Sequence, residues 1–525
     1  MKKRIVAAML TAAMVIGMTA CGSGGDQAAS SGSKESTAGT EKAETQEAAS
    51  WDGVYDLDFY YPVYFYMPSE EGIADVEEAL NAITADKVGV NVKLHPIDYF
   101  AYSDQMNLVL SSGEKVDLFM PLTGLSSYVS KGQILPITDY SAELKETMDL
   151  MGEDFLKSSY IGDDLYAIPR YGANTMVWYF VYRNDIAEEV GFDKESVKDV
   201  DDLEELLTKV HEAHPEIYPL VPTNAGDQML IRATDDGEFG YAVDYLGDSE
   251  DGCTGCIVND EETVENFYAT DAFKQMVQRA YDWNKKGLLM PETSVSPDIA
   301  QDLIASGKGF GTLIGYGYPG SDKQFNSGTY GTYPMSFVTV GQDIMQSSCF
   351  NVEWGVGYTS EDAAAACRFL NLLYTDTDVL NLIIYGIKDV DYTLNGDPTQ
   401  MASLGFPEGY DITTVPYTAR ITCGLMGNQF IMYGFGGEIE EFGMNLIENS
   451  TRSSALGFLF DSSNVKTQVT AVQNVISQYY KGLVCGELNP DETIPKFVSE
   501  LEAAGINDII AEKQAQLDAW RANQK

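Results

Sequence analysis

The feature that most limits the fold of this chain is an alternation of strand-like and helix-like segments over residues 57–120. Three segments have the apolar runs or the period-2 alternation of strands, and the two segments between them carry apolar residues at helical spacing. The strand-like segments are residues 57–66, 88–94 and 116–120, and the helix-like segments are residues 73–83 and 102–111. A β-α-β-α-β order predicts a parallel sheet with helices on both faces, and so an α/β fold.

The loops that follow the predicted strands are where we first expect a ligand. In open α/β sheets, ligands bind beyond the carboxyl ends of the strands. Here these ends lead into residues 61–68 and 121–127. We therefore expect part of a binding site in these two loops.

The rest of the chain continues the mixture of strands and helices. Further strands are predicted at residues 175–184, 307–314 and 352–358. Helices are predicted at residues 201–213, 269–287, 298–306, 361–374 and 463–483, and one long helix at residues 493–524. The helix over residues 269–287 ends in Lys-Lys-Gly, which is typical of a helix C-terminus.

The composition indicates that most of this chain folds, and its charge limits the kinds of partner that it can bind. Its 525 residues are 44% hydrophobic and 11% aromatic, enough for large cores. The formal net charge of −47 disfavours nucleic acid, and it favours a neutral or cationic ligand over an anionic one. With only three histidines in the sequence, a His-rich metal site is not expected. No cofactor or metal is expected.

The N-terminal segment has the organisation of a secretion signal. Residues 1–20 are a short basic start followed by an apolar run, which is too short for a comfortable membrane span. The run ends in Met-Thr-Ala before Cys21, which resembles a lipobox, in which the cysteine is diacylated and becomes the new N-terminus. An ordinary signal peptide with a chance cysteine is the alternative. A lipidated Cys21 would hold the protein on the outer face of the cell membrane.

The segment that follows Cys21 has the composition of a flexible tether. Residues 22–50 contain no aromatic residue and no Ile, Leu or Val, so they cannot form a core. A flexible chain of this length spans about 30 Å. Residues 21–50 are therefore expected to join the anchor to the folded part.

The remaining cysteines are too few for a disulfide-based fold. Cys253 and Cys256 have the CxxC spacing of redox and zinc sites, but no second CxxC or nearby histidine completes a zinc set. A local disulfide or two free thiols on a loop are both open and are favoured over redox or metal chemistry.

Several motifs together resemble the family 1 extracellular solute-binding proteins of carbohydrate ABC importers. The motifs are residues 117–121 with 127–139 (DLFMP and SYVSKGQILPITD), residues 162–169 (GDDLYAIP), residues 306–314 (SGKGFGTLI) and residues 363–377 (AAAACRFLNLLYTDT). Residues 380–392 and residues 458–520 are similar to a narrower group, and the most specific match is residues 460–492 (FDSSNVKTQVTAVQNVISQYYKGLVCGELNPDE). That group is the LipO-type lipoproteins of Gram-positive bacteria, which carry an added C-terminal domain of unknown function.

This resemblance implies a periplasmic-binding-protein-like fold of type II, with two hinged lobes around a ligand cleft. The first lobe would be residues 51–166 plus 352–396. The second would be residues 167–350 plus 397–525, including a C-terminal helical extension. The function implied is capture of a sugar or oligosaccharide and its delivery to the permease of an ABC transporter. The protein would act as a monomer and would not be an enzyme.

A sugar has apolar faces and a rim of hydroxyls, so its site needs flat aromatic side chains with polar groups at their edges. The expected ligand-binding residues are Tyr64, Tyr66, Thr123, Ser126, Arg170, Tyr171, Asn174, Tyr316, Tyr318, Glu353, Trp354 and Asn428. Tyr316 and Tyr318 are the strongest candidates, because glycines flank them and the family resembled has an aromatic residue there. For any single aromatic residue, packing in a core is the competing interpretation.

Two other classes of function compete with sugar binding. A peptide or another non-sugar ligand could occupy the same fold, since fold does not determine ligand. The other class is a surface glycosidase or polysaccharide lyase, and a glycosidase would need two carboxylates set across a sugar. With 80 acidic residues such pairs arise by chance, and no catalytic signature stands out, so an enzyme is not expected.

Overall fold

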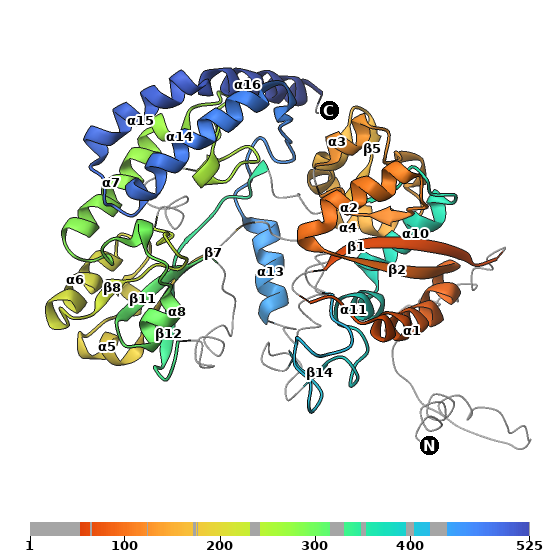
Figure 1. The fold of residues 1–525 in the computed structure, drawn as a ribbon, viewed down its shortest axis with the longest axis horizontal. Helices are drawn as coiled ribbons and strands as arrows, with labels where there is room; N and C mark the ends of the chain where they lie inside the picture. Colours follow the sequence, from red (N-terminus) through yellow and green to blue (C-terminus); the bar gives the residue numbers. More distant parts are fainter. Residues whose placement is uncertain are drawn as a thin grey trace, which may run out of the picture. The chain divides into compact units, whose positions relative to one another are not determined.

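The computed structural model describes residues 53–63, 66–122, 124–171, 175, 177–230, 242–315, 330–347, 353–394, 404–419 and 438–523. Two larger sheets organise these residues, and Figure 1 shows each with its own set of helices. None of the helices in these ranges combines the length and apolar character needed to cross a membrane.

The first sheet has five strands in the order β2-β1-β3-β13-β6. They are β2 (Val90–Asp98), β1 (Tyr55–Val63), β3 (Leu118–Phe119), β13 (Glu353–Val356) and β6 (Ala167–Pro169). Strand β1 pairs in parallel with both β2 and β3, which confirms the parallel arrangement predicted from residues 57–120. Strand β13 runs antiparallel to its neighbours β3 and β6.

Helices cover the first sheet, as the β-α-β-α-β order predicts. They are α1 (Glu70–Val88), α2 (Tyr99–Ser112), α3 (Leu125–Ser130), α4 (Lys145–Leu156), α10 (Ala363–Thr375) and α11 (Thr377–Tyr385). In Figure 1, α1 and α11 lie on one side of β1 and β2, and α2 lies on the other.

Local signals set the limits of α1. The Ser69 side chain accepts a hydrogen bond from the Gly72 amide at the start of the helix, and Gly89 ends the helix with a left-handed φ of 68°.

The core of the first sheet follows from the alternation along β1. Leu57, Phe59 and Tyr61 point to the same face and are fully buried. The Phe59 ring centroid lies 5.2 Å from that of Trp354 on β13 and 5.7 Å from that of Phe369 on α10. These contacts join strands that are nearly 300 residues apart in the chain into one core.

The second sheet has four strands in the order β12-β7-β11-β8. They are β12 (Met335–Gln342), β7 (Val177–Arg183), β11 (Gly309–Ile314) and β8 (Tyr218–Leu220). The central strand β7 is buried on both faces. Trp178, Phe180 and Tyr182 belong to one hydrophobic cluster, whereas the alternate residues Val177 and Tyr179 belong to another.

Helices flank this second sheet as well. They are α5 (Asn184–Glu189), α6 (Leu203–Ala213), α7 (Asp271–Lys285) and α8 (Ala300–Ala305). Short strand pairs complete the described part: β4 (Tyr160–Ile161) with β5 (Asp164–Leu165), β9 (Val243–Asp244) with β10 (Ile257–Val258), and β14 (Thr393–Leu394) with β15 (Leu404–Gly405). Helix α13 (Glu438–Asn449) precedes the C-terminal helices.

The C-terminal part is a group of three helices, α14 (Lys466–Val484), α15 (Pro490–Ala504) and α16 (Ile506–Asn523). The prediction of one helix over residues 493–524 was wrong. Gly505 adopts a φ of 98°, in the left-handed region, and so ends α15 before α16 begins. Figure 1 shows these helices beside α7, and their apolar residues share a core with it.

A buried lysine ties α16 to the second half of the molecule. Lys513 is fully buried, and its Nζ donates hydrogen bonds to Asp248 Oδ2 at 2.7 Å and to the Gly255 carbonyl at 2.9 Å. A buried ammonium group is costly unless it is paired and hydrogen-bonded, so these partners are what make its position tolerable. They fix the segment that contains Cys253 and Cys256 against the C-terminal helices.

The expected division of the chain into lobes at these boundaries stays a prediction, and two observations bear on it. Strand β6, which falls in the expected second lobe, pairs with β13 in the first sheet. Tyr417 is fully buried in the core of the first sheet, and its hydroxyl lies 3.0 Å from that of Tyr61.

Candidate functional site

Two of the expected ligand-binding residues follow the carboxyl ends of neighbouring strands in the first sheet. Tyr66 follows β1 and is 40% exposed, and Ser126 follows β3 in the first turn of α3. Because β1 and β3 are parallel neighbours, their carboxyl ends lie at the same edge of the sheet. The sheet therefore brings the segments of Tyr66 and Ser126 to the edge where ligands are expected.

Ser126 lines a cavity of about 630 Å³. Other residues of the cavity lie in segments far away in the chain, around residues 246–254 and 459–469. This volume is within the range of small-molecule binding sites.

The connection between the two sheets after β6 contains two further expected residues. Tyr171 is only 6% exposed, and its ring centroid lies 5.0 Å from that of Phe155. Burial, together with the nearby Glu448 carboxylate, raises the pKa of Tyr171, so its hydroxyl stays protonated. Arg170 precedes it and is partly buried.

Glu353 and Trp354 lie at the start of β13, where the chain returns to the first sheet. Both side chains are buried. Trp354 packs against Phe59 in the core, and Glu353 Oε1 accepts a hydrogen bond from Ser159 Oγ at 3.2 Å. This burial favours a role in packing and in the connection between sheets over direct ligand contact in this conformation.

The carboxyl group of Glu353 has a strongly raised pKa. Burial raises its pKa to about 8, and the hydrogen bond from Ser159 only partly offsets this. The group is therefore mostly protonated at neutral pH in the folded protein. Because Glu353 is buried at this connection, the free energy of unfolding of the protein should depend on pH.

A second pairing of chain segments lies at the same connection. The Met345 amide donates to the Thr451 carbonyl at 2.8 Å, and the Ser453 amide donates to the Met345 carbonyl at 3.0 Å. The segment after β12 and the segment after α13 thus run side by side as a short parallel bridge. Paired crossing segments of this kind are suited to act as a hinge.

The other expected residues cannot be placed. Cys21, Tyr64, Thr123, Asn174, Tyr316, Tyr318 and Asn428 lie outside the described residues.

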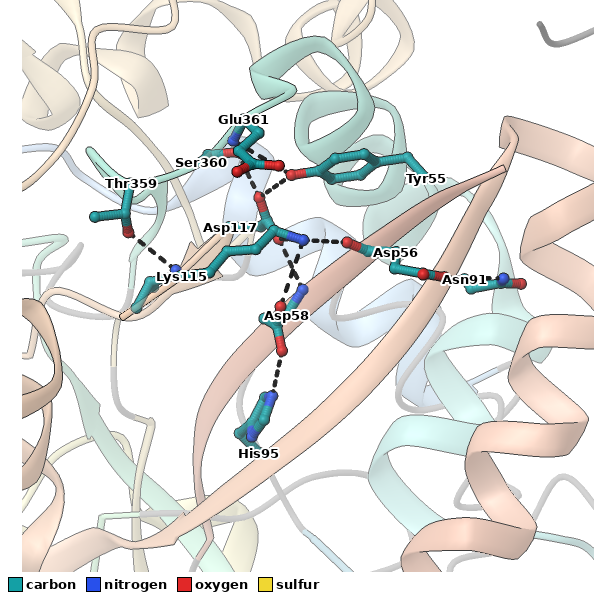
Figure 2. A network of polar contacts seen from close by, with 11 residues as sticks. Tyr55, Asp56, Asp58, Asn91, His95, Lys115, Asp117, Thr359, Ser360 and Glu361 are labelled. Atoms are coloured by element: carbon teal, nitrogen blue, oxygen red, sulfur yellow. Dashed lines mark hydrogen bonds and ion pairs between the residues drawn. The ribbon is translucent and has the colours of Figure 1, made fainter. Parts of the chain in front are cut away.

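Sequence reasoning missed a network of charged residues in the first sheet, which Figure 2 shows. Asp117 is fully buried and accepts hydrogen bonds from Tyr55 Oη at 2.7 Å and from Ser360 Oγ at 2.6 Å. Lys115 Nζ lies 3.2 Å from Asp117, and His95 Nε2 lies 2.7 Å from Asp58. The signal that could have found it is a charged residue directly before the buried strand β3.

This network belongs to the fold and not to the candidate site. Burial alone would lower the pKa of Lys115, but the charge of Asp117 outweighs it and raises the pKa. Tyr55 begins β1 and Asp117 directly precedes β3, so the network sits at the amino ends of these strands. Ligand loops leave from the opposite ends.

The CxxC pair is not arranged for redox chemistry. Cys253 and Cys256 are fully buried free thiols. A hydrogen bond with Cys253, together with burial, raises the pKa of Cys256, which disfavours the reactive thiolate. Within the described part of the chain, no three His, Cys, Asp or Glu residues lie close enough together to hold a metal ion.

Comparison with models of known protein families shows the family to which this chain belongs. A model of a family described as bacterial extracellular solute-binding protein matches residues 69–379, more than half of the chain. This chain belongs to that family. A second family model, for a domain of unknown function called DUF3502, matches residues 454–522. This region contains α14, α15 and all of α16 except its last residue, Asn523.

One curated relative agrees with this membership. A protein of Streptococcus pneumoniae serotype 4, named carbohydrate ABC transporter substrate-binding protein, is 22% identical over 467 residues, which are 85% of this chain and 87% of the relative. The family binds solutes and does not convert them, in agreement with the prediction that this chain is not an enzyme.

Solved structures confirm the two-lobed α/β fold. The N-glycan transport solute-binding protein NgtS of Streptococcus pneumoniae aligns with a TM-score of 0.68 and 19% identity, over 90% of this chain and all of NgtS. A protein of Bifidobacterium longum infantis, described as an HMO-binding, ABC-transporter-associated solute-binding protein, aligns with a TM-score of 0.58 and 14% identity, over 90% of this chain and all of that one.

We predict that Glu353 makes stability fall as pH rises. Its pKa is raised in the folded protein, so its contribution is complete below the unfolded pKa near 4.5 and is lost as pH rises through about 8. Between pH 6 and pH 8 the free energy of unfolding should fall by about 2–3 kcal/mol. In Glu353→Gln this fall should largely disappear, as denaturant titration at each pH would show.

Glu361→Gln is the matched control, because Glu361 is an exposed carboxylate that follows β13 by five residues. It should keep the pH dependence of the original protein. Asp391, whose burial raises its pKa to about 6, acts mainly below this window. An unchanged slope in Glu353→Gln would show that Glu353 is charged at neutral pH in the folded state.

Proposed function

We propose that this protein is a lipid-anchored extracellular binding protein that captures a sugar or oligosaccharide between its two lobes and delivers it to the permease of an ABC transporter. The observation that carries the proposal is the family match over residues 69–379 together with carbohydrate-binding relatives of the same fold. NgtS has also been solved in complex with Man5GlcNAc, a form that aligns with a TM-score of 0.55. The likeness to the LipO-type lipoproteins and the lipidation of Cys21 are part of this proposal.

The proposed mechanism is a shift between open and closed conformations. Each lobe has its own hydrophobic core, so the lobes can move as rigid bodies about the connections between the sheets. A ligand that contacts both lobes stabilises the closed form by its differential affinity for it. The closed protein, as a monomer, then docks on the permease at the outer face of the membrane.

The proposed ligand contacts are those expected from sequence, with Tyr316 and Tyr318 as stacking residues. Polar contacts are proposed from Tyr64, Thr123, Ser126, Arg170, Asn174 and Asn428, with further aromatic contacts from Tyr66 and Tyr171. Glu353 and Trp354 would support the site from beneath, since both are buried. The net charge of −47 favours a neutral ligand, as unmodified glycans are.

The organisation that we propose keeps residues 1–20 as a signal peptide and residues 21–50 as the lipidated cysteine and tether. We keep the first lobe as residues 51–166 plus 352–396, and the second as residues 167–350 plus 397–525. The pairing of β6 and the burial of Tyr417 favour adding residues 167–169 and 404–419 to the first lobe.

We expect the mature protein to bind glycans, and Tyr316→Ala and Tyr318→Ala each to weaken the binding by about 1–3 kcal/mol through loss of stacking. Isothermal titration of Man5GlcNAc, Man1GlcNAc, kestose and a set of peptides measures this directly. Tyr410→Ala is the control, because Tyr410 is an exposed tyrosine outside the proposed site. Binding of peptides but no glycan would contradict the proposed ligand class.

We expect Cys21→Ser to release the protein from the membrane fraction of a Gram-positive host. Two acyl chains on one cysteine give a stable anchor, and without them no other anchor is proposed. Fractionation followed by immunoblotting measures the distribution, with Ser30→Ala in the same segment as the control. A Cys21→Ser protein that stays with the membrane would contradict the lipid anchor.

A further inference from the structure

The family DUF3502 has no stated function, and in this protein it forms part of a cavity wall. The cavity of about 630 Å³ is lined by residues from three segments: Leu122 and residues between 124 and 131 after β3, residues between 246 and 254 before β10, and residues between 459 and 469 at the start of the C-terminal helices. The last of these segments lies inside the region matched to DUF3502. A cavity shared by three distant segments depends on how each is held in place.

The segment 246–254 is held rigidly by the C-terminal domain. Asp248 Oδ2 accepts hydrogen bonds from Lys513 Nζ, from the Thr254 amide and from Thr254 Oγ1, each at 2.7 Å. Gln473 on α14 also donates to the Gly252 carbonyl at 2.7 Å. This wall is therefore preorganised, which lowers the entropy that a ligand must lose on binding.

Phe460 gives this wall a flat apolar surface. It lines the cavity and is only partly buried. The side chain packs against the cluster that contains Leu246 and Phe458, and Lys513 Nζ lies 5.1 Å from its ring centroid. A ring fixed in this way and open to a cavity is the arrangement on which the apolar face of a sugar stacks.

Polar groups line the cavity as well as Phe460. Ser126, Ser127, Ser462 and Ser463 contribute hydroxyl groups. All three hydrogen bonds of Asp248 end on Oδ2, so Oδ1 accepts none from the residues that the structure describes. These are the donors and acceptors that sugar hydroxyls require.

The charges that line the cavity are balanced. The lining contains two lysines, Lys131 and Lys466, and two aspartates, Asp248 and Asp461, although the net charge of the whole chain is −47. In the described part of the chain neither of these lysines forms an ion pair. A locally balanced, hydroxyl-rich cavity with one aromatic surface suits a neutral oligosaccharide.

We propose that this cavity is an oligosaccharide subsite, in which the DUF3502 domain supplies Phe460 as the stacking residue and Lys513 holds the adjoining loop through Asp248. The proposal rests on the proposed function, because it assigns part of the glycan to a place in the protein. It gives the C-terminal domain a role in ligand recognition as well as in stability.

The experiment is isothermal titration of the mature protein with Man5GlcNAc, Man1GlcNAc and kestose, comparing the tightest binder among them across variants. Phe460→Ala should weaken it about 10–100-fold, as loss of a central aromatic contact does. Phe460→Tyr keeps the ring and should stay within about threefold of the original protein. Leu108→Ala removes a leucine that is 70% exposed on α2 and is not among the residues that line the cavity, and it should have no effect.

A second variant tests the cavity without touching the C-terminal core. Ser130 is an exposed residue of α3 that lines the cavity, so Ser130→Trp should fill the space and weaken the same glycan. If Phe460→Ala and Ser130→Trp both fold and bind as the original protein does, the subsite is refuted and the proposed function stands. If the original protein binds no glycan at all, the proposed function fails and the subsite fails with it.

Discussion

The separation of two buried sheets is the constraint on which the rest of this structure depends. The five-stranded sheet and the four-stranded sheet belong to different hydrophobic clusters, so each half is stabilised by its own core. The chain must then pass between the two halves three times: between β6 and β7, between β12 and β13, and again between α13 and the C-terminal helices. Rigid halves joined by a few crossing segments permit closure around a ligand at small cost in packing.

Because the crossing segments join the two halves, some of their polar and aromatic side chains are buried. Glu353 and Trp354 begin β13, directly after such a crossing, and both are shielded from solvent. Trp354 joins β13 to the core through Phe59, whereas Glu353 stays protonated because burial disfavours its charge. A neutral buried acid hydrogen-bonded to Ser159 fixes the end of the strand without the cost of an unpaired charge.

The C-terminal helices extend the second half by the same physical means. Their apolar residues share a core with α7, and the buried Lys513 connects α16 to the loop at Asp248. A fully buried ammonium group has no water to bind and must donate its hydrogen bonds to protein acceptors. Lys513 therefore fixes the position of the loop that contains Asp248 and Gly255. This single contact links the stability of the added domain to the shape of the cavity that it helps to line.

Much of the fold was predictable from local pattern. The alternation along β1 and the helical spacing of α1 and α2 predicted the parallel sheet, because period and capping are written into neighbouring residues. The split between α15 and α16 was missed, since a single glycine within a helical pattern does not reveal its left-handed φ.

The candidate site was less accessible to sequence reasoning than the fold. An aromatic residue on a strand looks the same whether it faces a core or a cleft, so Trp354 could be named as a ligand contact although it packs on Phe59. The pairing of Lys513 with Asp248 joins residues 265 positions apart, and no local pattern signals it.

The most direct test of the account is small-angle X-ray scattering of the mature protein with and without a glycan that titration shows to bind. Closure of the two lobes around the ligand predicts that the radius of gyration decreases when the site is saturated. An unchanged radius of gyration at full occupancy would contradict capture by closure of the lobes.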